Sequence, residues 1–157
     1  MAFLHRFFFF SSAPVTFKTE LYISSGGIDF LTYHKQGTAE GTSFHVSNIG
    51  KGNEDINHIV DTLPEICNNV AFNGLFFKCT AEQTESGGGM RKFTAWINPQ
   101  NISHVRASIS TGTIIYFRSG RLLAIANTLK DFMKGLIEHN KKYSERRRSD
   151  YGKKDSE

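Results

Sequence analysis

The chain has 157 residues, of which 39% are hydrophobic and 22% charged, a balance typical of a folded protein and not of a disordered one. This length suits one domain with its own core, and the 14 phenylalanines predict that the core is rich in Phe. Only two cysteines occur, Cys67 and Cys79, which excludes a disulfide-rich scaffold. We expect two free thiols in a reducing, cytoplasmic compartment, with a bridge between them as the alternative.

The net charge of +4 is unevenly distributed along the chain. From Lys141 to Glu157 the sequence holds seven Lys and Arg and four Asp and Glu, so this segment carries +3 and the rest carries +1. Any basic surface that binds a partner is therefore expected at the C-terminus. We expect residues 141–157 to form a basic, disordered tail.

The N-terminus begins with the apolar stretch MAFLHRFFFF. Its uninterrupted apolar run, Phe7 to Phe10, is shorter than the roughly 7 to 15 residues that the core of a signal peptide needs. We therefore expect residues 1–16 to form an apolar arm or a first strand. No segment has the roughly 18 apolar residues of a membrane span, so no membrane partner is expected.

The next segments predict strands. Residues 17–24 alternate between apolar and polar side chains, which is the pattern of a half-buried strand. Residues 25–27, Ser-Gly-Gly, can form a turn, after which residues 28–34 are expected to return as the second strand of a hairpin. The following segment, KQGTAEGTS, is rich in turn-forming residues, and residues 44–49 are expected to form a short third strand.

From residue 53 to residue 70 the apolar positions recur at spacings of three and four, which predicts one helix. Asn53 is its expected N-cap, and Glu54 and Asp55 are favourable near the positive end of the helix dipole. Pro64 removes a backbone donor inside this segment. We therefore expect a kink, or two short helices that meet beside the proline.

Residues 75–81, LFFKCTA, are expected to form a buried strand. The run that follows, EQTESGGG, contains three consecutive glycines. It can act as a break between two halves of one domain or as a long mobile hairpin loop. We expect a single α+β domain over residues 17–140, with a possible subdivision at residues 82–90.

The second half has clearer signals. Residues 93–97 alternate as in a strand, Asn98-Pro99 predicts a turn, and Ser119-Gly120 between two apolar runs predicts a two-residue hairpin. Thr128 with Asp131 three residues later is a variant of the capping box, which predicts the start of a helix. The apolar positions of that helix have the spacing of a stripe that packs on a sheet. They are Leu129, Phe132, Met133, Leu136 and Ile137.

Both halves place a helix after antiparallel hairpins, although no residue-level repeat is visible. The expected fold class is α+β, an antiparallel β-sheet built from hairpins with two helices packed on one face.

Residues 96–142 resemble two families. Their order of strand, turn, paired strands, turn and Lys-ended helix resembles the flagellar-regulator FlbD family, with the features Asn98-Pro99, Ile102, Thr113, Ile115, Gly120 and Lys141-Lys142. The part from Ile102 to Leu136, with a helix that begins Thr128-Leu129-Lys130, is similar to the first part of LytTR-type DNA-binding domains. The first resemblance implies a small non-enzymatic regulator and the second implies DNA binding. The LytTR-type strands that meet DNA after this helix have no counterpart here.

The leading functional hypothesis is a small non-enzymatic regulatory protein that binds nucleic acid through its last hairpin and its basic tail. Two arginines flank the hairpin turn, and the tail adds cations that can neutralise phosphates. The expected nucleic-acid-binding residues are Arg118, Arg121, Lys141, Lys142, Arg146, Arg147, Arg148, Lys153 and Lys154. The alternative is a protein-interaction module, an inhibitor or adaptor, that acts through a sheet edge or through the Phe-rich N-terminus.

The sequence contains no strong catalytic, metal or phosphate motif, and its six histidines lack the spacing of a metal site. We therefore expect no catalytic residues, no metal ligands and no cofactor. A small nuclease is the remaining enzymatic possibility, with His104 or His45 as the base and Arg118 or Arg121 holding a phosphate.

Overall fold

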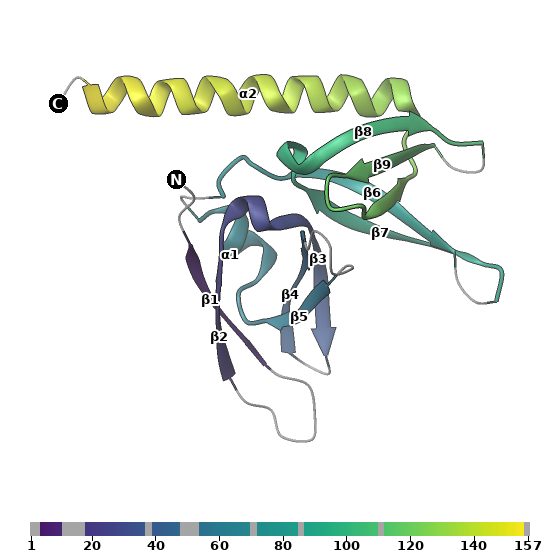
Figure 1. Cartoon of the computed structure of the whole chain (residues 1–157), viewed down its shortest axis with the longest axis horizontal. Coiled ribbons are helices and arrows are strands. Elements are labelled where there is room, and N and C mark those ends of the chain that lie inside the picture. Colours follow the sequence, from purple (N-terminus) through teal and green to yellow (C-terminus); the bar gives the residue numbers. More distant parts are fainter. Residues whose placement is uncertain are drawn as a thin grey trace.

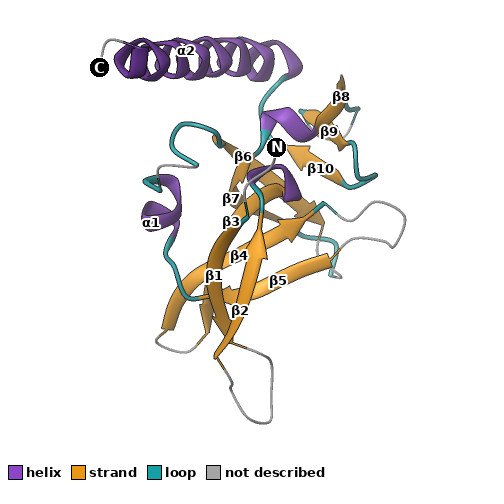
Figure 2. Cartoon of the chain, turned by 60° about the vertical axis from the view of Figure 1, so that its left-hand side comes forward, coloured by secondary structure: helices purple, strands orange, loops and turns teal. Residues whose placement is uncertain are grey.

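The described residues form one continuous antiparallel sheet of ten strands and two helices (Figures 1 and 2). The computed structural model describes residues 4–10, 18–36, 39–47, 54–69, 72–84, 87–109 and 112–155. The strands are β1 (His5–Phe10), β2 (Lys18–Ile23), β3 (Ile28–Gln36), β4 (Ala39–Val46), β5 (Glu54–Ile59), β6 (Phe77–Thr84), β7 (Met90–Ile97), β8 (Ile102–Ala107), β9 (Thr113–Phe117) and β10 (Leu122–Ile125). The helices are α1 (Leu63–Cys67) and α2 (Leu129–Asp155).

The fold is therefore α+β with an antiparallel sheet, as expected, and most of it is sheet. The expected pair of packed helices is not found, because α1 has five residues and α2 has 27. The strand order across the sheet is β2-β1-β5-β4-β3-β7-β6-β10-β9-β8. Residues 1–16 were expected to form an arm or a strand, and β1 provides the strand, paired with both β2 and β5.

The two halves of the sheet have the same topology. In the first half, β1 and β2 form a hairpin, and a 3₁₀ turn (Ser25–Gly27) leads to β3. β3 then pairs with β4, β4 pairs with β5, and β5 pairs with β1. Strands β6 to β10 repeat each step, with a second 3₁₀ turn (Pro99–Asn101) and with β10 paired to β6. A helix follows each half. We call residues 5–67 repeat 1 and residues 77–155 repeat 2.

Strand register shows which residues of the repeats are equivalent. Val60 N donates to Phe8 O at 2.9 Å, and Ala126 N donates to Thr80 O at 2.9 Å, so the last strand meets the first at the same point in each repeat. Both third strands carry a register shift one residue after they begin, between Ile28 and Phe30 in β3 and between Ile102 and His104 in β8. Such bulges bend a strand locally and are specific features of its pairing. The two repeats therefore correspond residue by residue at these points, although β4 and β5 carry a further register shift that β9 and β10 lack.

These equivalences align two sequence segments, Ile-Val-Asp-Thr-Leu-Pro-Glu-Ile at residues 59–66 and Ile-Ala-Asn-Thr-Leu-Lys-Asp-Phe at residues 125–132. The expectation that no residue-level repeat is visible is thereby corrected. Connections of different length separate the matching segments, since β4 and β5 are joined by residues 47–53 whereas β9 and β10 are joined by residues 118–121. A fixed-period comparison of the sequence therefore misses the repeat.

The segment predicted as one helix, residues 53–70, forms strand β5 followed by α1. The prediction was wrong over β5 because pairing with β4 outweighs its helical periodicity. The expected cap, Asn53, lies outside the described residues. Helix α1 instead begins after Thr62, whose backbone N–H donates to the Glu65 carboxylate at 2.8 Å. Pro64 occupies the first turn of α1, where its missing N–H leaves no bond unmade.

The strands near residues 17–49 exist, but they pair differently from the predicted hairpin. β2 pairs with β1, and β3 pairs with β4 and β7. The turn at Ser25–Gly27 carries the chain from one strand pair to the next, so the hairpin between residues 17–24 and 28–34 is wrong. The turn-rich segment extends β3 to Gln36 and begins β4 at Ala39. The third strand therefore starts earlier than predicted, and residues 48–50 lie outside the described residues.

Predictions for the second half agree better with the structure. The Gly-rich run connects β6 and β7, which pair along their whole length, so the hairpin alternative is confirmed and the break is not. The hairpin at Ser119-Gly120 joins β9 and β10. Thr128 caps α2 as predicted, because its side-chain Oγ1 accepts a hydrogen bond from Asp131 N at 3.2 Å. Residues 141–155, for which we expected a disordered tail, continue α2.

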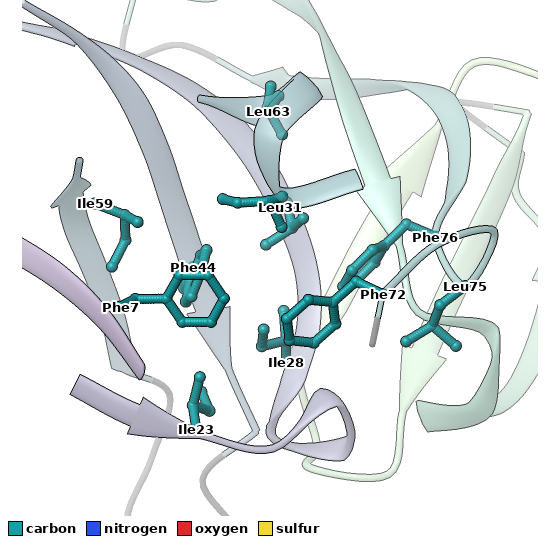
Figure 3. Close-up of a cluster of buried hydrophobic side chains, with 11 residues drawn as sticks. Phe7, Ile23, Ile28, Leu31, Phe44, Ile59, Leu63, Phe72, Leu75 and Phe76 are labelled. Carbon is teal, nitrogen blue, oxygen red and sulfur yellow. The ribbon is translucent and has the colours of Figure 1, made fainter. Parts of the chain in front are cut away.

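The buried hydrophobic side chains form two clusters, one mainly from repeat 1 with the segment that follows it and one mainly from repeat 2. Core 1, drawn in Figure 3, consists of Phe7, Ile23, Ile28, Leu31, Phe44, Ile59, Leu63, Ile66, Phe72, Leu75 and Phe76. Core 2 consists of Phe30, Cys79, Ala81, Ala95, Ile97, Ile115, Phe117, Leu123, Ile125, Phe132 and Leu136. Phe30 comes from repeat 1 but packs in core 2, where its ring centroid is 5.9 Å from that of Phe117. The repeats are therefore joined through side chains as well as through the pairing of β3 with β7.

Helix α2 lies across the ends of both halves of the sheet (Figure 1) and packs on both cores. Phe132 and Leu136 are buried in core 2. Further along the helix, the His139 ring lies 3.1 Å from Leu75 O, and Tyr143 packs against core 1. The helix of repeat 2 thus covers part of the core of repeat 1.

Candidate functional site

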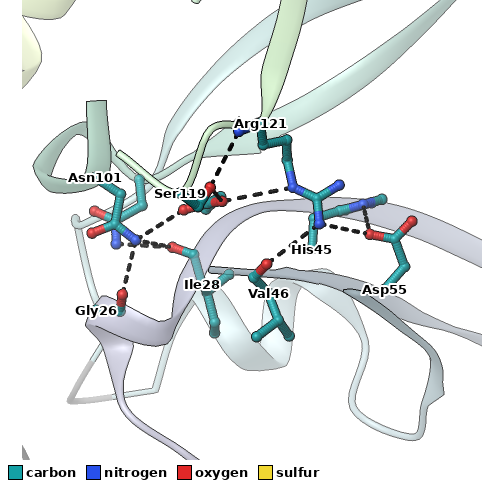
Figure 4. A network of polar contacts seen from close by, with 10 residues as sticks. Gly26, Ile28, His45, Val46, Asp55, Asn101, Ser119 and Arg121 are labelled. Atoms are coloured by element: carbon teal, nitrogen blue, oxygen red, sulfur yellow. Dashed lines mark hydrogen bonds and ion pairs between the residues drawn. The ribbon is translucent and has the colours of Figure 1, made fainter. Parts of the chain in front are cut away.

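The sequence-predicted cation Arg121 lies inside the protein, in the polar network of Figure 4. Its residue exposure is 8%, and its guanidinium approaches two carboxylates, Asp29 Oδ2 at 3.6 Å from Nε and Asp55 Oδ1 at 3.1 Å from Nη2. Nη2 also donates to Val46 O at 3.3 Å. Sequence reasoning placed Arg121 on a basic surface because its acidic partners lie far away along the chain.

Asp29 is the centre of this network and is fully buried at the bulge of β3. Ser119 Oγ donates to its Oδ2 at 2.6 Å, and Asn101 Nδ2 donates to its Oδ1 at 3.2 Å. A buried carboxylate is tolerated only when its charge and lone pairs are satisfied in this way. The donors come from repeat 2, so Asp29 ties the two repeats together.

Arg118, on the other side of the hairpin turn, is exposed. Its backbone N donates to Asn101 O at 2.9 Å, which fixes the turn against the second 3₁₀ turn. The structure therefore separates the two hairpin arginines, with Arg118 facing solvent and Arg121 facing Asp29 and Asp55. Among the described side chains, Arg121 contacts Asp29 and Asp55, whereas the α2 cation Arg146 bonds to Asn73.

The remaining predicted cations all belong to α2. Lys141, Lys142 and Arg146 are exposed, and Arg146 Nη1 donates to Asn73 Oδ1 at 2.9 Å. Lys130 and Lys134, which the sequence prediction omitted, are exposed as well. The backbone of α2 includes Arg147, Arg148, Lys153 and Lys154, whose side chains lie outside the described part.

Three of the exposed lysines share one face of α2. Lys130, Lys134 and Lys141 are four and seven residues apart, a spacing that brings side chains to the same side of a helix. At 3.6 residues per turn this side is opposite the one that buries Phe132 and Leu136. We call the three lysines the lysine face. Glu138 and Glu145 are exposed beside it.

A groove of about 1110 Å³ lies between the repeats, with walls from both. Its lining includes the aromatic residues Tyr33, Phe93 and Trp96 and also His45, Asp55 and Arg121 from the network. Sequence reasoning missed the groove because its walls come from strands that are distant in sequence. Only a prediction of the strand pairing could have found it.

His45 connects the network to the groove. Its Nδ1 is 2.9 Å from Asp55 Oδ1, and its Nε2 is 2.9 Å from Thr32 Oγ1. Burial lowers the pKa of His45, an effect that the charge of Arg121 adds to and the carboxylate of Asp55 opposes. A hydroxyl, an imidazole and a carboxylate in series can activate a nucleophile.

The repeat shows whether the contact of His45 with its neighbour is specific to a catalytic role. The His45 ring stacks on Phe30 with centroids 4.0 Å apart. In repeat 2 the position of His45 is held by Tyr116 and that of Phe30 by His104, and these rings also stack, at 4.3 Å. In repeat 2, however, the position of Thr32 is held by Arg106, so the ring stack recurs without the hydroxyl of Thr32. We interpret His45 primarily as a packing residue that joins neighbouring strands.

Both cysteines are free, which confirms the expectation of two thiols over that of a bridge. Burial raises the pKa of Cys79 to about 12 and also raises that of Cys67. Within the described ranges, no group of three or more His, Cys, Asp and Glu side chains is placed to hold a metal ion. In the same part of the chain, neither helix combines the length and the apolar character needed to cross a membrane.

The Phe-rich N-terminus is part of the fold. β1 is paired on both sides, and Phe7 is 2% exposed within core 1. Its ring meets that of Phe44 edge to face with centroids 5.0 Å apart. These residues are therefore not a free arm.

The chain matches no family model, no curated protein and no solved structure. The resemblance of residues 96–142 to the FlbD and LytTR families therefore stays a prediction from sequence.

Proposed function

We propose that this protein is a non-enzymatic regulatory module that binds nucleic acid through the lysine face of α2. The supporting observation is the location of the charge. Helix α2 holds nine of the 19 Lys and Arg and five of the 15 Asp and Glu, so it carries a formal +4, the whole net charge of the chain. The rest of the molecule has no net charge, so α2 is the element with the largest excess of positive charge, which favours its attraction for a polyanion.

The setting of the helix also favours this function. Packing on two cores holds α2 in place, so its exposed cations are presented without first ordering a flexible segment. The lysine side chains contact phosphates of the nucleic-acid backbone. Such contacts give affinity and salt dependence but no selectivity for a base sequence. Glu138 and Glu145 next to the lysine face reduce its attraction for anions. Arg118 extends the contact only if the ligand reaches the β9–β10 turn.

The experiment is a salt series of fluorescence-anisotropy titrations with labelled single-stranded and duplex DNA and RNA. The test variant is K130Q/K134Q/K141Q, and the matched control is K18Q/K78Q/K92Q, which removes the same charge from exposed sites on strands β2, β6 and β7. For duplex DNA we expect the test variant to lose at least tenfold in affinity and to flatten the plot of log affinity against log salt by about 0.9 per lost contact.

The control should bind like the wild type at moderate salt. Equal weakening by both triple variants would show that only net charge matters and would overturn the proposal. Absence of binding by the wild type at low salt would overturn it as well. R118Q, titrated in parallel, tests whether the hairpin belongs to the binding surface.

A further inference from the structure

We propose that copies of this chain associate head to tail, with the outer edge of β8 in one copy pairing with the outer edge of β2 in the next. The observation behind this inference is the junction between the repeats. β3 of repeat 1 pairs antiparallel with β7 of repeat 2, with Phe30 opposite Ile97, Leu31 opposite Trp96 and Thr32 opposite Ala95. The chain therefore contains one example of this edge-to-edge contact between two units of the same topology.

The strands at the two ends of the sheet are the repeat equivalents of the strands at this junction. β8 corresponds to β3, since each is the third strand of its repeat and each carries the same bulge. β2 corresponds to β7, since Ile23 and Ile97 face the first residues of β1 and β6. In the strand order of the described residues, β2 and β8 each have a neighbour on one side only. The edge that β3 offers to β7 is thus offered again by β8.

Register equivalence predicts the pairs at the new contact. His104, Val105 and Arg106 stand where Phe30, Leu31 and Thr32 stand at the junction, and Ile23, Tyr22 and Leu21 stand where Ile97, Trp96 and Ala95 stand. The central pair is then Val105 with Tyr22, an aliphatic residue opposite an aromatic one, as Leu31 is opposite Trp96. Pairs of this kind stabilise neighbouring strands.

The side chains at both edges are accessible for such pairing. Tyr22 is 53% exposed, and on β8 the exposed His104 and Arg106 flank Val105, which is half-buried against core 2. Unpaired strand edges have backbone donors and acceptors that another strand can satisfy. The contact is heterologous, because different edges meet, so it produces a closed ring or an open chain of copies and not a two-fold dimer.

The test uses two single variants whose blocked edges are different. Y22K blocks the β2 edge and leaves β8 intact, whereas V105K blocks the β8 edge and leaves β2 intact. In sedimentation velocity over a concentration series, we expect the wild type to form higher species and each variant alone to stay monomeric. A 1:1 mixture of the two should form a dimer and stop there, because one unblocked edge of each type remains.

L122K is the control, because Leu122 is 56% exposed but lies on β10, which has neighbours on both sides. It should associate like the wild type. A wild type that is monomeric throughout the series would overturn the proposal, and so would a mixture that stays monomeric while both variants keep the wild-type circular dichroism spectrum. The inference does not depend on the nucleic-acid proposal, and no nucleic acid is present in the test.

A second variant keeps the test decisive if V105K does not fold. In a C67S background, Y22C/V105C places two thiols opposite each other at the proposed contact, within reach of a disulfide. Mild oxidation should then produce a ladder of covalent oligomers. Y22C/I137C, with its second thiol on the exposed side of α2, should not. Equal cross-linking of both pairs would indicate random collision and would overturn the proposal.

Discussion

Thr42 and Thr113 make the same hydrogen bond at equivalent points of the two repeats. Thr42 Oγ1 donates to Asp61 O at 2.7 Å, and Thr113 Oγ1 donates to Asn127 O at 2.8 Å. Both threonines are fully buried. In each repeat this bond holds the fourth strand to the segment that leads into the helix.

The residue before each threonine is a glycine for a steric reason. A Cβ on Gly41 would collide with Ile59 O, and a Cβ on Gly112 would collide with Asn127 O. Both repeats therefore need the dipeptide Gly-Thr. The glycine leaves room for the backbone of the neighbouring segment, and the threonine side chain bonds to a carbonyl of that segment.

Thr42→Val and Thr113→Val should each lower the free energy of unfolding by about 1–3 kcal/mol, because each leaves a carbonyl without its donor while keeping the side-chain shape. Urea denaturation measures the effect. Thr→Ser at the same positions keeps the hydroxyl and should lose less stability. Serine variants as unstable as the valine variants would assign the effect to packing instead.

Asp29→Asn should lower the free energy of unfolding by about 3–5 kcal/mol, because it removes one partner of a buried ion pair and leaves the Arg121 charge with less compensation. The matched control is Asp55→Asn, since the Asp55 side chain is 44% exposed and pairs with the same guanidinium. The control should cost about 1 kcal/mol or less. Equal losses for both variants would contradict the central role assigned to Asp29.

His45 should make the protein less stable as the pH falls below 6.5, the ordinary pKa of its imidazole. Burial lowers the pKa of His45 in the folded state. Just below pH 6.5 the imidazole is therefore protonated in the unfolded chain but not yet in the folded chain. The contribution is therefore present above pH 6.5 and is lost as the pH falls through the lowered pKa.

Denaturation of the wild type and of H45Q on both sides of pH 6.5 tests this expectation. The difference in unfolding free energy between them should shrink on acidification. A difference that is constant with pH would show that His45 does not titrate differently in the two states.

Cys79 should react slowly with thiol reagents at neutral pH in the folded protein, because burial raises the pKa of its thiol to about 12 and little thiolate is present. A C67S variant isolates this thiol, and an aromatic disulfide reagent measures its reaction rate. The rate should rise sharply when denaturant unfolds the chain. Rapid reaction of the folded C67S variant would contradict the buried position of Cys79 in core 2.

Two predictions from local signals in the second half agreed with the structure, whereas the turn at Ser25–Gly27 does not close the hairpin that was expected there. The turn at Ser119-Gly120 and the cap at Thr128 are encoded within a few residues, so neighbouring strands do not alter them. β5 was predicted as a helix because Ile56 and Ile59 fit a helical spacing, whereas its conformation depends on pairing with β4 and β1. Sheet pairing acts between distant segments, and the sequence pattern does not contain it.

The candidate sites divide in the same way. Seven of the nine cations of α2 were named from the composition of the C-terminal segment, whereas Lys130 and Lys134, nearer the start of the helix, were omitted. The inward direction of Arg121 was missed, since it depends on Asp29 in the other repeat. The relation of β8 to β3 was hidden by connections of unequal length, and only strand register shows it.

Because helix α2 packs on both cores, the exposure of one core to solvent is coupled to that of the other. It reaches from Phe132 in core 2 to Tyr143 against core 1, while α1 provides repeat 1 with only five helical residues. Melting of α2 would therefore uncover both cores at once, and a ligand that binds only the folded helix would protect both. Binding of any ligand to the lysine face would thus be thermodynamically linked to the stability of both cores.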